Sequence, residues 1–167
     1  MWNQAYQEKS GVKQLIRGAL LILCLSFLEV NADSGVFVFS VDKPMTEVYD
    51  KVYKSLEEAR FYVVFEPNIG KNLSGFAERW GDQYNRSKLS AIRSLVFCNG
   101  WYANQVSNKD PHMLALCPLH MTLIEKDGKT TALFARPTVI AADSPAAEIL
   151  SELEVEVIAA IKKGMKE

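Results

Sequence analysis

Clusters of basic residues are missing from this sequence. Its 19 lysines and arginines are balanced by 20 acidic residues, and no stretch of the chain gathers the basic ones into a block. Nucleic-acid-binding domains carry a concentrated basic surface, so the sequence excludes that class of partner. Internal repeats and low-complexity segments are missing as well. A chain of 167 residues is long enough for one domain with a sizeable core.

The usual catalytic signatures are also absent. The sequence has no glycine-rich phosphate-binding loop, no Gly-x-Ser-x-Gly motif, and no Cys, His and Asp in the order of a known protease. Acidic residues are plentiful, but none is visibly paired for acid–base catalysis. We therefore expect no catalytic residue and no cofactor, and we favour a protein that is not an enzyme. An unrecognised hydrolase is the weaker alternative.

The main apolar run is too short to cross a membrane. It extends from residue 18 to 28, whereas a membrane-spanning helix needs about 20 apolar residues. Basic residues precede the run and Ala32 follows it, which is the order of a secretory signal peptide. We expect residues 1–32 to be removed on export, leaving residues 33–167 as one periplasmic or secreted domain without a permanent membrane span. A buried helix of a cytosolic protein is the alternative, weakened because the run is apolar on every face.

Hydrophobic periodicity predicts alternating strands and helices after the signal. Strands are expected over 36–41, 61–65, 91–97, 119–125 and 130–135, and helices over 44–59, 73–80, 99–106 and 145–165. Asp127-Gly128 predicts a hairpin turn between the last two strands, and the nearly all-apolar strand 61–65 is expected at the centre of the sheet. The predicted class is α+β: a mixed sheet of about five strands with helices packed on it.

Four short motifs follow one another in the second half of the chain. They are Leu95-Val96-Phe97-Cys98-Asn99, Lys109-Asp110-Pro111, Leu116-Cys117-Pro118-Leu119 and Glu125-Lys126-Asp127-Gly128-Lys129. Their order resembles the domain-of-unknown-function 302 (DUF302) family, and the resemblance covers residues 36–161. The family usually has a glycine before the aromatic residue that opens the second strand. This chain has Arg60 before Phe61, so we expect the turn to be made differently. The resemblance implies a small α+β domain that often self-associates, here as a homodimer, and it implies no established activity.

Cysteine is scarce, since only Cys98 and Cys117 remain once residues 1–32 are removed. Both stand at expected strand boundaries joined by one short helix, so we predict that they lie close together. In an oxidising compartment they could form one structural disulfide. They could instead be two inert buried thiols, or a thiol that handles redox chemistry or a ligand. Their spacing matches no Cys-x-x-Cys redox motif and leaves the three alternatives open.

Histidine is scarcer still, with His112 and His120 on either side of Cys117. Together with the cysteines they supply soft metal ligands. Cys117 and His120 are three residues apart, however, and on a strand that spacing turns two side chains to opposite faces. We therefore expect no metal site and interpret the histidines as surface or capping residues.

The candidate binding or redox site is the rim at the end of the third strand. It consists of Cys98, Asn99, Trp101 and Cys117, with His120 as a neighbour. A strand end and a helix start meet there, so a thiol would be activated by the helix dipole, and amides of the Asn99-Gly100 turn could hold a small anion. A packed turn without function is the alternative. Our leading hypothesis is a non-enzymatic exported module that binds a small ligand or a partner. The second is a thiol-based redox, sulfur-handling or metal-binding protein that uses Cys98 and Cys117.

Overall fold

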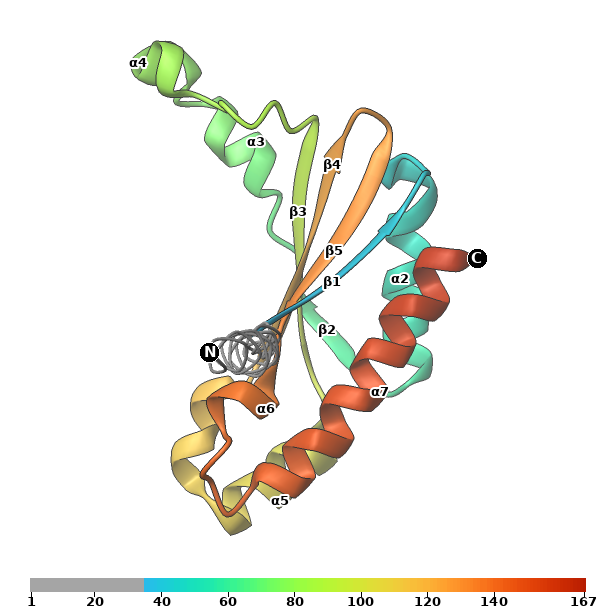
Figure 1. The fold of residues 1–167 in the computed structure, drawn as a ribbon, viewed down its shortest axis with the longest axis vertical. Helices are drawn as coiled ribbons and strands as arrows, with labels where there is room; N and C mark the ends of the chain where they lie inside the picture. The colour runs from blue at the N-terminus through green and yellow to red at the C-terminus, as the bar shows by residue number, and fades with distance from the viewer. Residues whose placement is uncertain (1–34) are drawn as a thin grey trace, which may run out of the picture. The chain divides into compact units, whose positions relative to one another are not determined.

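The computed structural model describes residues 35–167 (Figure 1). The strands are β1 (Val36–Val41), β2 (Tyr62–Phe65), β3 (Ala91–Cys98), β4 (Leu119–Lys126) and β5 (Lys129–Ala135). The helices are α2 (Met45–Glu58), α3 (Ile69–Ser74), α4 (Ala77–Trp80), α5 (Gly100–Lys109), α6 (Pro137–Ile140) and α7 (Ala147–Lys166), with 3₁₀ turns η1 (Gly81–Gln83) and η2 (Pro111–Leu116). The export signal expected over residues 1–32 lies outside the described residues. Within the described part, no helix is long and apolar enough to cross a membrane.

The five strands form one sheet in the order β1-β5-β4-β3-β2. This confirms the predicted α+β class with five strands, but every strand pair is antiparallel, so the prediction of a mixed sheet is wrong. A parallel pair needs a crossover between neighbouring strands. Here α2 follows β1 and leads to β2, and these two strands lie at opposite edges of the sheet.

The second strand is at an edge of the sheet, so its predicted central position is also wrong. The strand is apolar on both faces, but only one of these faces is covered. Val63 is half-buried, whereas Tyr62 and Phe65 are 55% and 63% exposed.

The core lies between the sheet and the two long helices, α2 and α7, which pack side by side on one face (Figure 1). Alternate residues of the central strands face these helices and are buried, as their period of two requires. The fully buried apolar strand residues are Leu95, Phe97, Met121, Leu123, Ala132 and Phe134. Ser55 of α2 donates a hydrogen bond to the carbonyl oxygen of Ala160 in α7 at 2.8 Å, so the two helices also contact through polar atoms.

The hairpin between β4 and β5 turns at Asp127 and Gly128, as predicted. Both residues have positive φ, 52° and 74°, which are the angles that a two-residue type I′ turn requires. The short helix α6 follows β5 and was not predicted, because its four residues are too few for periodicity to detect.

A left-handed residue ends α2. Arg60 has φ 65°, its amide bonds to the carbonyl of Glu57, and the next amide, from Phe61, bonds to the carbonyl of Leu56. These two hydrogen bonds form a Schellman motif, in which the left-handed position favours glycine. The chain thus places arginine in a glycine-type conformation, and Phe61 enters the core fully buried.

Arg60→Gly is therefore expected to raise the free energy of unfolding by up to about 1 kcal/mol. The substitution removes the steric cost of a Cβ atom in the left-handed region, about 1–2 kcal/mol. Part of this gain is cancelled because glycine increases the conformational entropy of the unfolded chain. Denaturant unfolding of the two proteins measures the difference. Arg60→Ala is the control, because it removes the guanidinium and keeps the Cβ, and it should bring no gain.

Candidate functional site

The two cysteines meet at one end of the sheet. Cys98 is the last residue of β3, and Cys117 lies between η2 and the start of β4. Phe97 pairs with Leu119 in the antiparallel ladder, so the last residue of β3 and the residues just before β4 lie at the same end of the sheet. The Sγ atoms are 3.2 Å apart, and both residues are half-buried free thiols.

Burial decides the protonation of Cys117. It raises the pKa of this thiol to about 11, and the hydrogen bond with the sulfur of Cys98 acts in the same direction. At neutral pH Cys117 is therefore protonated, and the thiolate is the form of cysteine that acts as a nucleophile or metal ligand. Cys117 is therefore suited to apolar packing in its neutral form and is not a reactive thiolate at neutral pH.

Asn99 has a structural task in this arrangement. Its side-chain oxygen accepts hydrogen bonds from the amides of Trp101 at 3.0 Å and Tyr102 at 3.3 Å, which makes it the N-cap of α5. These bonds satisfy two of the helix's first amides. The residue itself is only 9% exposed.

The rim residues Trp101 and His120 point elsewhere. Trp101 is 67% exposed and does not line the pocket described below. His120 is exposed and lies opposite Val96 in the strand ladder, on the sheet face away from the helices. The neighbouring Leu119 and Met121 face the core. The structure therefore brings together Cys98, Asn99 and Cys117 and separates them from Trp101 and His120.

A small apolar pocket opens beside the thiols. Its cavity volume is about 20 Å³, room for one very small group, and α5, η2 and α7 supply most of its wall. Its lining residues are Cys98, Asn99, Tyr102, Ala103, Val106, Met113, Leu114, Leu116, Cys117, Leu119, Leu150 and Leu153. The candidate site defined from the sequence contains three of these residues, Cys98, Asn99 and Cys117. Leu150 and Leu153 fall within the helix expected over 145–165, but nothing in their spacing places them around the cysteines.

The titratable side chains of the pocket wall are those of Cys98, Cys117 and Tyr102. No aspartate, glutamate, histidine, lysine or arginine lines it. Within the described residues, no three His, Cys, Asp or Glu side chains gather closely enough to hold a metal ion. His112 lies on η2, outside the lining, where its amide bonds to the carboxylate of Asp110. What the arrangement offers chemically is therefore an apolar surface and a pair of thiols.

A second polar cluster lies on the helix-covered side of the sheet. The guanidinium of Arg93 stacks 3.5 Å from the ring centroid of Tyr49, and the Tyr49 hydroxyl donates to Glu66 at 2.6 Å. Burial, followed by the hydrogen bond to Glu66, raises the pKa of Tyr49. Arg93 also lies 3.9 Å from Glu66, so the charges compensate each other and tie α2 to β3 and to the end of β2. This cluster is structural.

Comparison with known proteins gives a family and a fold. The sequence model of the domain of unknown function DUF302 matches residues 37–164. The crystal structure of an uncharacterized conserved DUF302 protein from Bacillus stearothermophilus is similar with a TM-score of 0.66 and 21% sequence identity. The similarity covers 78% of this chain and 98% of that one, and at this identity it shows the fold alone. No curated protein matches the chain. Because the family match extends over more than half of the sequence, the chain belongs to the DUF302 family.

Proposed function

We propose that this domain is an exported, non-enzymatic binding module whose pocket beside Cys98 and Cys117 takes a small apolar group. The observation that carries the proposal is the lining of the pocket, which is aliphatic, aromatic and sulfur-containing apart from Asn99. Small-molecule sites are mostly apolar concavities with few polar groups. The one amide of this site is occupied by capping α5, so apolar contact is the interaction that the pocket offers.

The absence of an acid–base pair supports a binding role over a catalytic one. General acid–base catalysis needs a titratable side chain within hydrogen-bond reach of the reacting group. The titratable groups among the lining residues are two thiols and the phenol of Tyr102, and burial raises the pKa of that phenol to about 12. The raised pKa of Cys117 removes it as a resting nucleophile.

Xenon is a suitable probe for the pocket, because xenon enters small apolar cavities without polar contacts. Under xenon pressure, the methyl resonances of Leu150, Leu153 and Met113 should shift and saturate, since these side chains line the pocket. Ala103→Phe should abolish the shifts, because the new ring fills the space beside α5. Asn104→Phe is the matched control: it adds the same ring one residue later, on an exposed part of the helix, and should leave the shifts intact.

Two results would overturn this proposal. One is a set of pocket methyl resonances that does not respond to xenon. The other is a response that survives in the Ala103→Phe protein, since the bound gas would then lie elsewhere.

A reversible dithiol is the second candidate function, and the sulfur separation of 3.2 Å favours it. A disulfide bond is about 2.05 Å long, so a small movement would join the two atoms. In that step each cysteine loses its proton and the pair gives two electrons to an external thiol oxidant, such as a partner's disulfide, which is reduced to two thiols. The apolar pocket next to the pair would then bind the partner's apolar residues.

Substitution of either cysteine tests this candidate. In the oxidised protein, Cys98→Ser and Cys117→Ser should each lower the free energy of unfolding by about 3 kcal/mol, the loop-closure value for a loop of this length. The double variant should lose no more than either single variant, because one bond is removed in all three. Additive losses, with no effect of reductant on the wild-type protein, would show two separate buried thiols.

The export part of the proposal is tested by sequencing the N-terminus of the protein isolated from cells. N-terminal sequencing of the protein recovered from the periplasm or medium should read Asp33 first, since the predicted cleavage follows Ala32. Accumulation of the uncleaved chain in the cytosol would contradict the export part of the proposal and leave the pocket unaffected.

A further inference from the structure

Three sulfur-containing side chains border the same small pocket. Cys98 ends β3, Cys117 precedes β4, and Met113 lies between them in sequence, on η2. All three residues are half-buried. Thiols and thioethers are soft, polarisable groups, and soft ligands select soft metal ions. The pocket therefore offers a set of ligands made of sulfur alone.

The separation of the two thiols suits an ion that both of them bind. Thiolates bind Zn²⁺ at about 2.3 Å, and Cu⁺, which has the same filled d shell, bonds to sulfur at a similar distance. Two sulfurs on one such ion in tetrahedral geometry lie about 3.8 Å apart. The observed 3.2 Å is about 0.6 Å short of that value and exceeds the length of a disulfide bond by about 1.2 Å. The pair is thus closer to a shared metal ion than to a covalent bond.

The kind of ligand separates Cu⁺ from Zn²⁺. A structural zinc site takes four ligands from cysteine, histidine and carboxylate side chains. Within residues 35–167, no three such side chains lie close enough to hold a metal ion. His120 points to the other face of the sheet, and His112 lies outside the pocket lining. Cu⁺ is stable with two or three sulfur ligands, so two cysteines and a methionine favour this ion.

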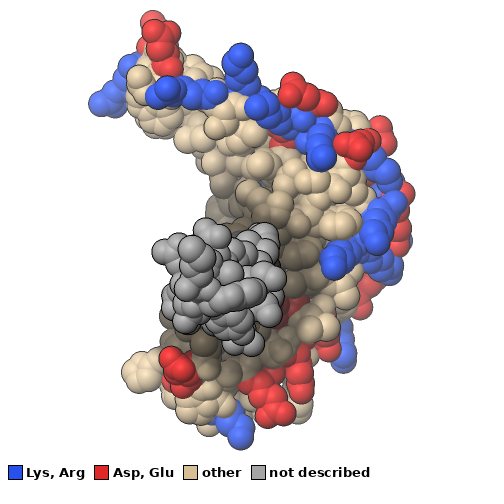
Figure 2. Space-filling view, in the orientation of Figure 1, with Lys and Arg blue, Asp and Glu red and all other residues tan. Residues whose placement is uncertain are grey.

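The surrounding charges suit a cation held by two thiolates. α5 has ten residues and begins at Gly100, two residues after Cys98. The positive end of its dipole stabilises the negative charge that two thiolates retain after binding one Cu⁺. The first half of α7 exposes Glu148, Glu152 and Glu156. Figure 2 shows acidic side chains at the end of the molecule that carries α5, and most basic ones toward the end that carries α3 and α4. The field at this end therefore attracts cations.

We propose that Cys98, Cys117 and Met113 bind one Cu⁺ ion at the rim of the pocket. A metal ion deprotonates the thiols that it binds, so each cysteine gives its proton to water and two protons leave for each ion bound. The proposal goes beyond the binding of an apolar group, because it uses the sulfurs of the rim and not the cavity. It replaces the expectation of no metal site, which weighed the two cysteines with His112 and His120 and left Met113 out.

Anaerobic titration of the reduced full-length chain with Cu⁺, in competition with a coloured Cu⁺ chelator, tests the site. The wild-type protein should bind one equivalent. Cys98→Ser and Cys117→Ser should each weaken binding by more than about 100-fold, because loss of an outer-shell partner alone costs about 10–100-fold. Cys24→Ser is the matched control: it removes the remaining cysteine of the sequence, which precedes the described residues, and should leave the affinity unchanged.

Met113→Leu tests the thioether separately from its packing. Leucine keeps a similar volume, so the variant should fold normally and lose about 10-fold or more in Cu⁺ affinity. Met121→Leu is its control, because Met121 is fully buried on β4 and is not part of the pocket lining. X-ray absorption of the Cu⁺-loaded wild-type protein should show three sulfur neighbours at about 2.3 Å, and that of Met113→Leu should show two.

Three results would overturn the copper site. They are Cu⁺ affinity that survives in Cys98→Ser or Cys117→Ser, nitrogen or oxygen neighbours around the ion in the wild-type protein, and a Met113→Leu protein that keeps full affinity and three sulfur neighbours. The absorption measurement on the wild-type protein needs no variant, so it decides the matter even where a cysteine variant fails to fold. The xenon response should persist in both cysteine variants, which distinguishes failure of the copper site from failure of the apolar pocket.

Discussion

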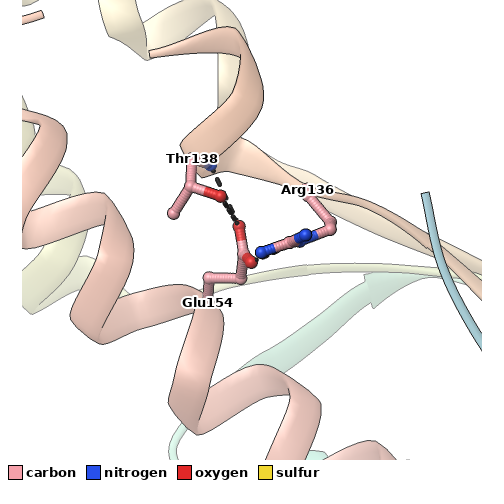
Figure 3. A network of polar contacts seen from close by, with 3 residues as sticks. All are labelled: Arg136, Thr138 and Glu154. Atoms are coloured by element: carbon pink, nitrogen blue, oxygen red, sulfur yellow. Dashed lines mark hydrogen bonds and ion pairs between the residues drawn. The ribbon is translucent and has the colours of Figure 1, made fainter. Parts of the chain in front are cut away.

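Glu154→Ala is expected to lower the free energy of unfolding by about 4 kcal/mol, because it breaks a buried ion pair from one side. Figure 3 shows the network: Glu154 of α7 accepts from the Arg136 guanidinium at 2.7 Å and from the Thr138 hydroxyl at 2.6 Å. It also accepts from the amide of Thr138 at 3.0 Å. Its side chain is 4% exposed and that of Arg136 is 24% exposed. Without the carboxylate, the Thr138 amide and hydroxyl and the Arg136 guanidinium lose this acceptor, and α6 loses a contact with α7.

Two controls separate the network from a general effect on the helix. Glu152→Ala removes an exposed carboxylate from the same helix and should change stability by no more than about 0.5 kcal/mol. The triple variant Arg136→Met, Thr138→Val and Glu154→Leu replaces these three side chains with apolar groups and should recover most of the loss. Equal losses in the single and triple variants would contradict the network's polar role.

The same carboxylate gives the domain a dependence on pH. Burial by itself would raise the pKa of Glu154, but the hydrogen bonds from Thr138 and Arg136 outweigh it and hold the pKa below its usual range. A lowered pKa contributes stability that is full above the unfolded value of about 4.3 and is lost as the pH falls through the folded value. The stability difference between wild type and Glu154→Gln should therefore shrink on acidification below this point. A constant difference would contradict the assignment.

Gly164→Ala is expected to lower the free energy of unfolding by about 3 kcal/mol, the upper part of the range for overpacking. A Cβ atom at this position of α7 would lie 2.5 Å from the Cα of Val52 and 2.8 Å from the carbonyl oxygen of Lys51. Both contacts are with the backbone of α2, so the two helices would have to separate. The better helix propensity of alanine returns only about 1 kcal/mol.

Gly100→Ala is the matched control for this substitution. Gly100 also lies in a helix, and a Cβ there would meet nothing within 4 Å. This variant should be as stable as the wild type or slightly more stable. Thermal unfolding of both variants decides the point, and a Gly164→Ala protein that melts like the wild type would show that α2 and α7 do not approach this closely.

Local signals predicted the elements, and long-range contacts decided their arrangement. The strand over 91–97, the long last helix and the Asp127-Gly128 hairpin follow from periodicity and turn chemistry, which neighbouring residues determine. The edge position of β2 was not predicted, because the sequence of an apolar strand does not show whether both of its faces are covered or one is exposed. Gly164 carried no signal, since the backbone of Val52 that requires it is distant in sequence.

The candidate site divides in the same way. Cys98 and Cys117 were expected to lie close together because both stand at strand boundaries. The structure confirms this, since the pairing of Phe97 with Leu119 brings both cysteines to the same end of the sheet. Trp101 is only two residues from Asn99 in sequence, but its helix position turns it outward, whereas Tyr102, the next residue, is buried against Phe61. The α7 part of the wall could not be predicted, because residues 150 and 153 line the same pocket as the cysteines only in the folded chain.

The most direct test of the account is to identify what the pocket holds in the cell. The wild-type chain and the Ala103→Phe variant are purified under the same mild conditions, unfolded in organic solvent, and their extracts are compared by mass spectrometry. We predict a small, predominantly apolar compound that accompanies the wild-type protein in a fixed ratio and is lost from Ala103→Phe but retained by Asn104→Phe. Extracts without such a compound, or with the same compound from all three proteins, would contradict the claim that this pocket is a binding site.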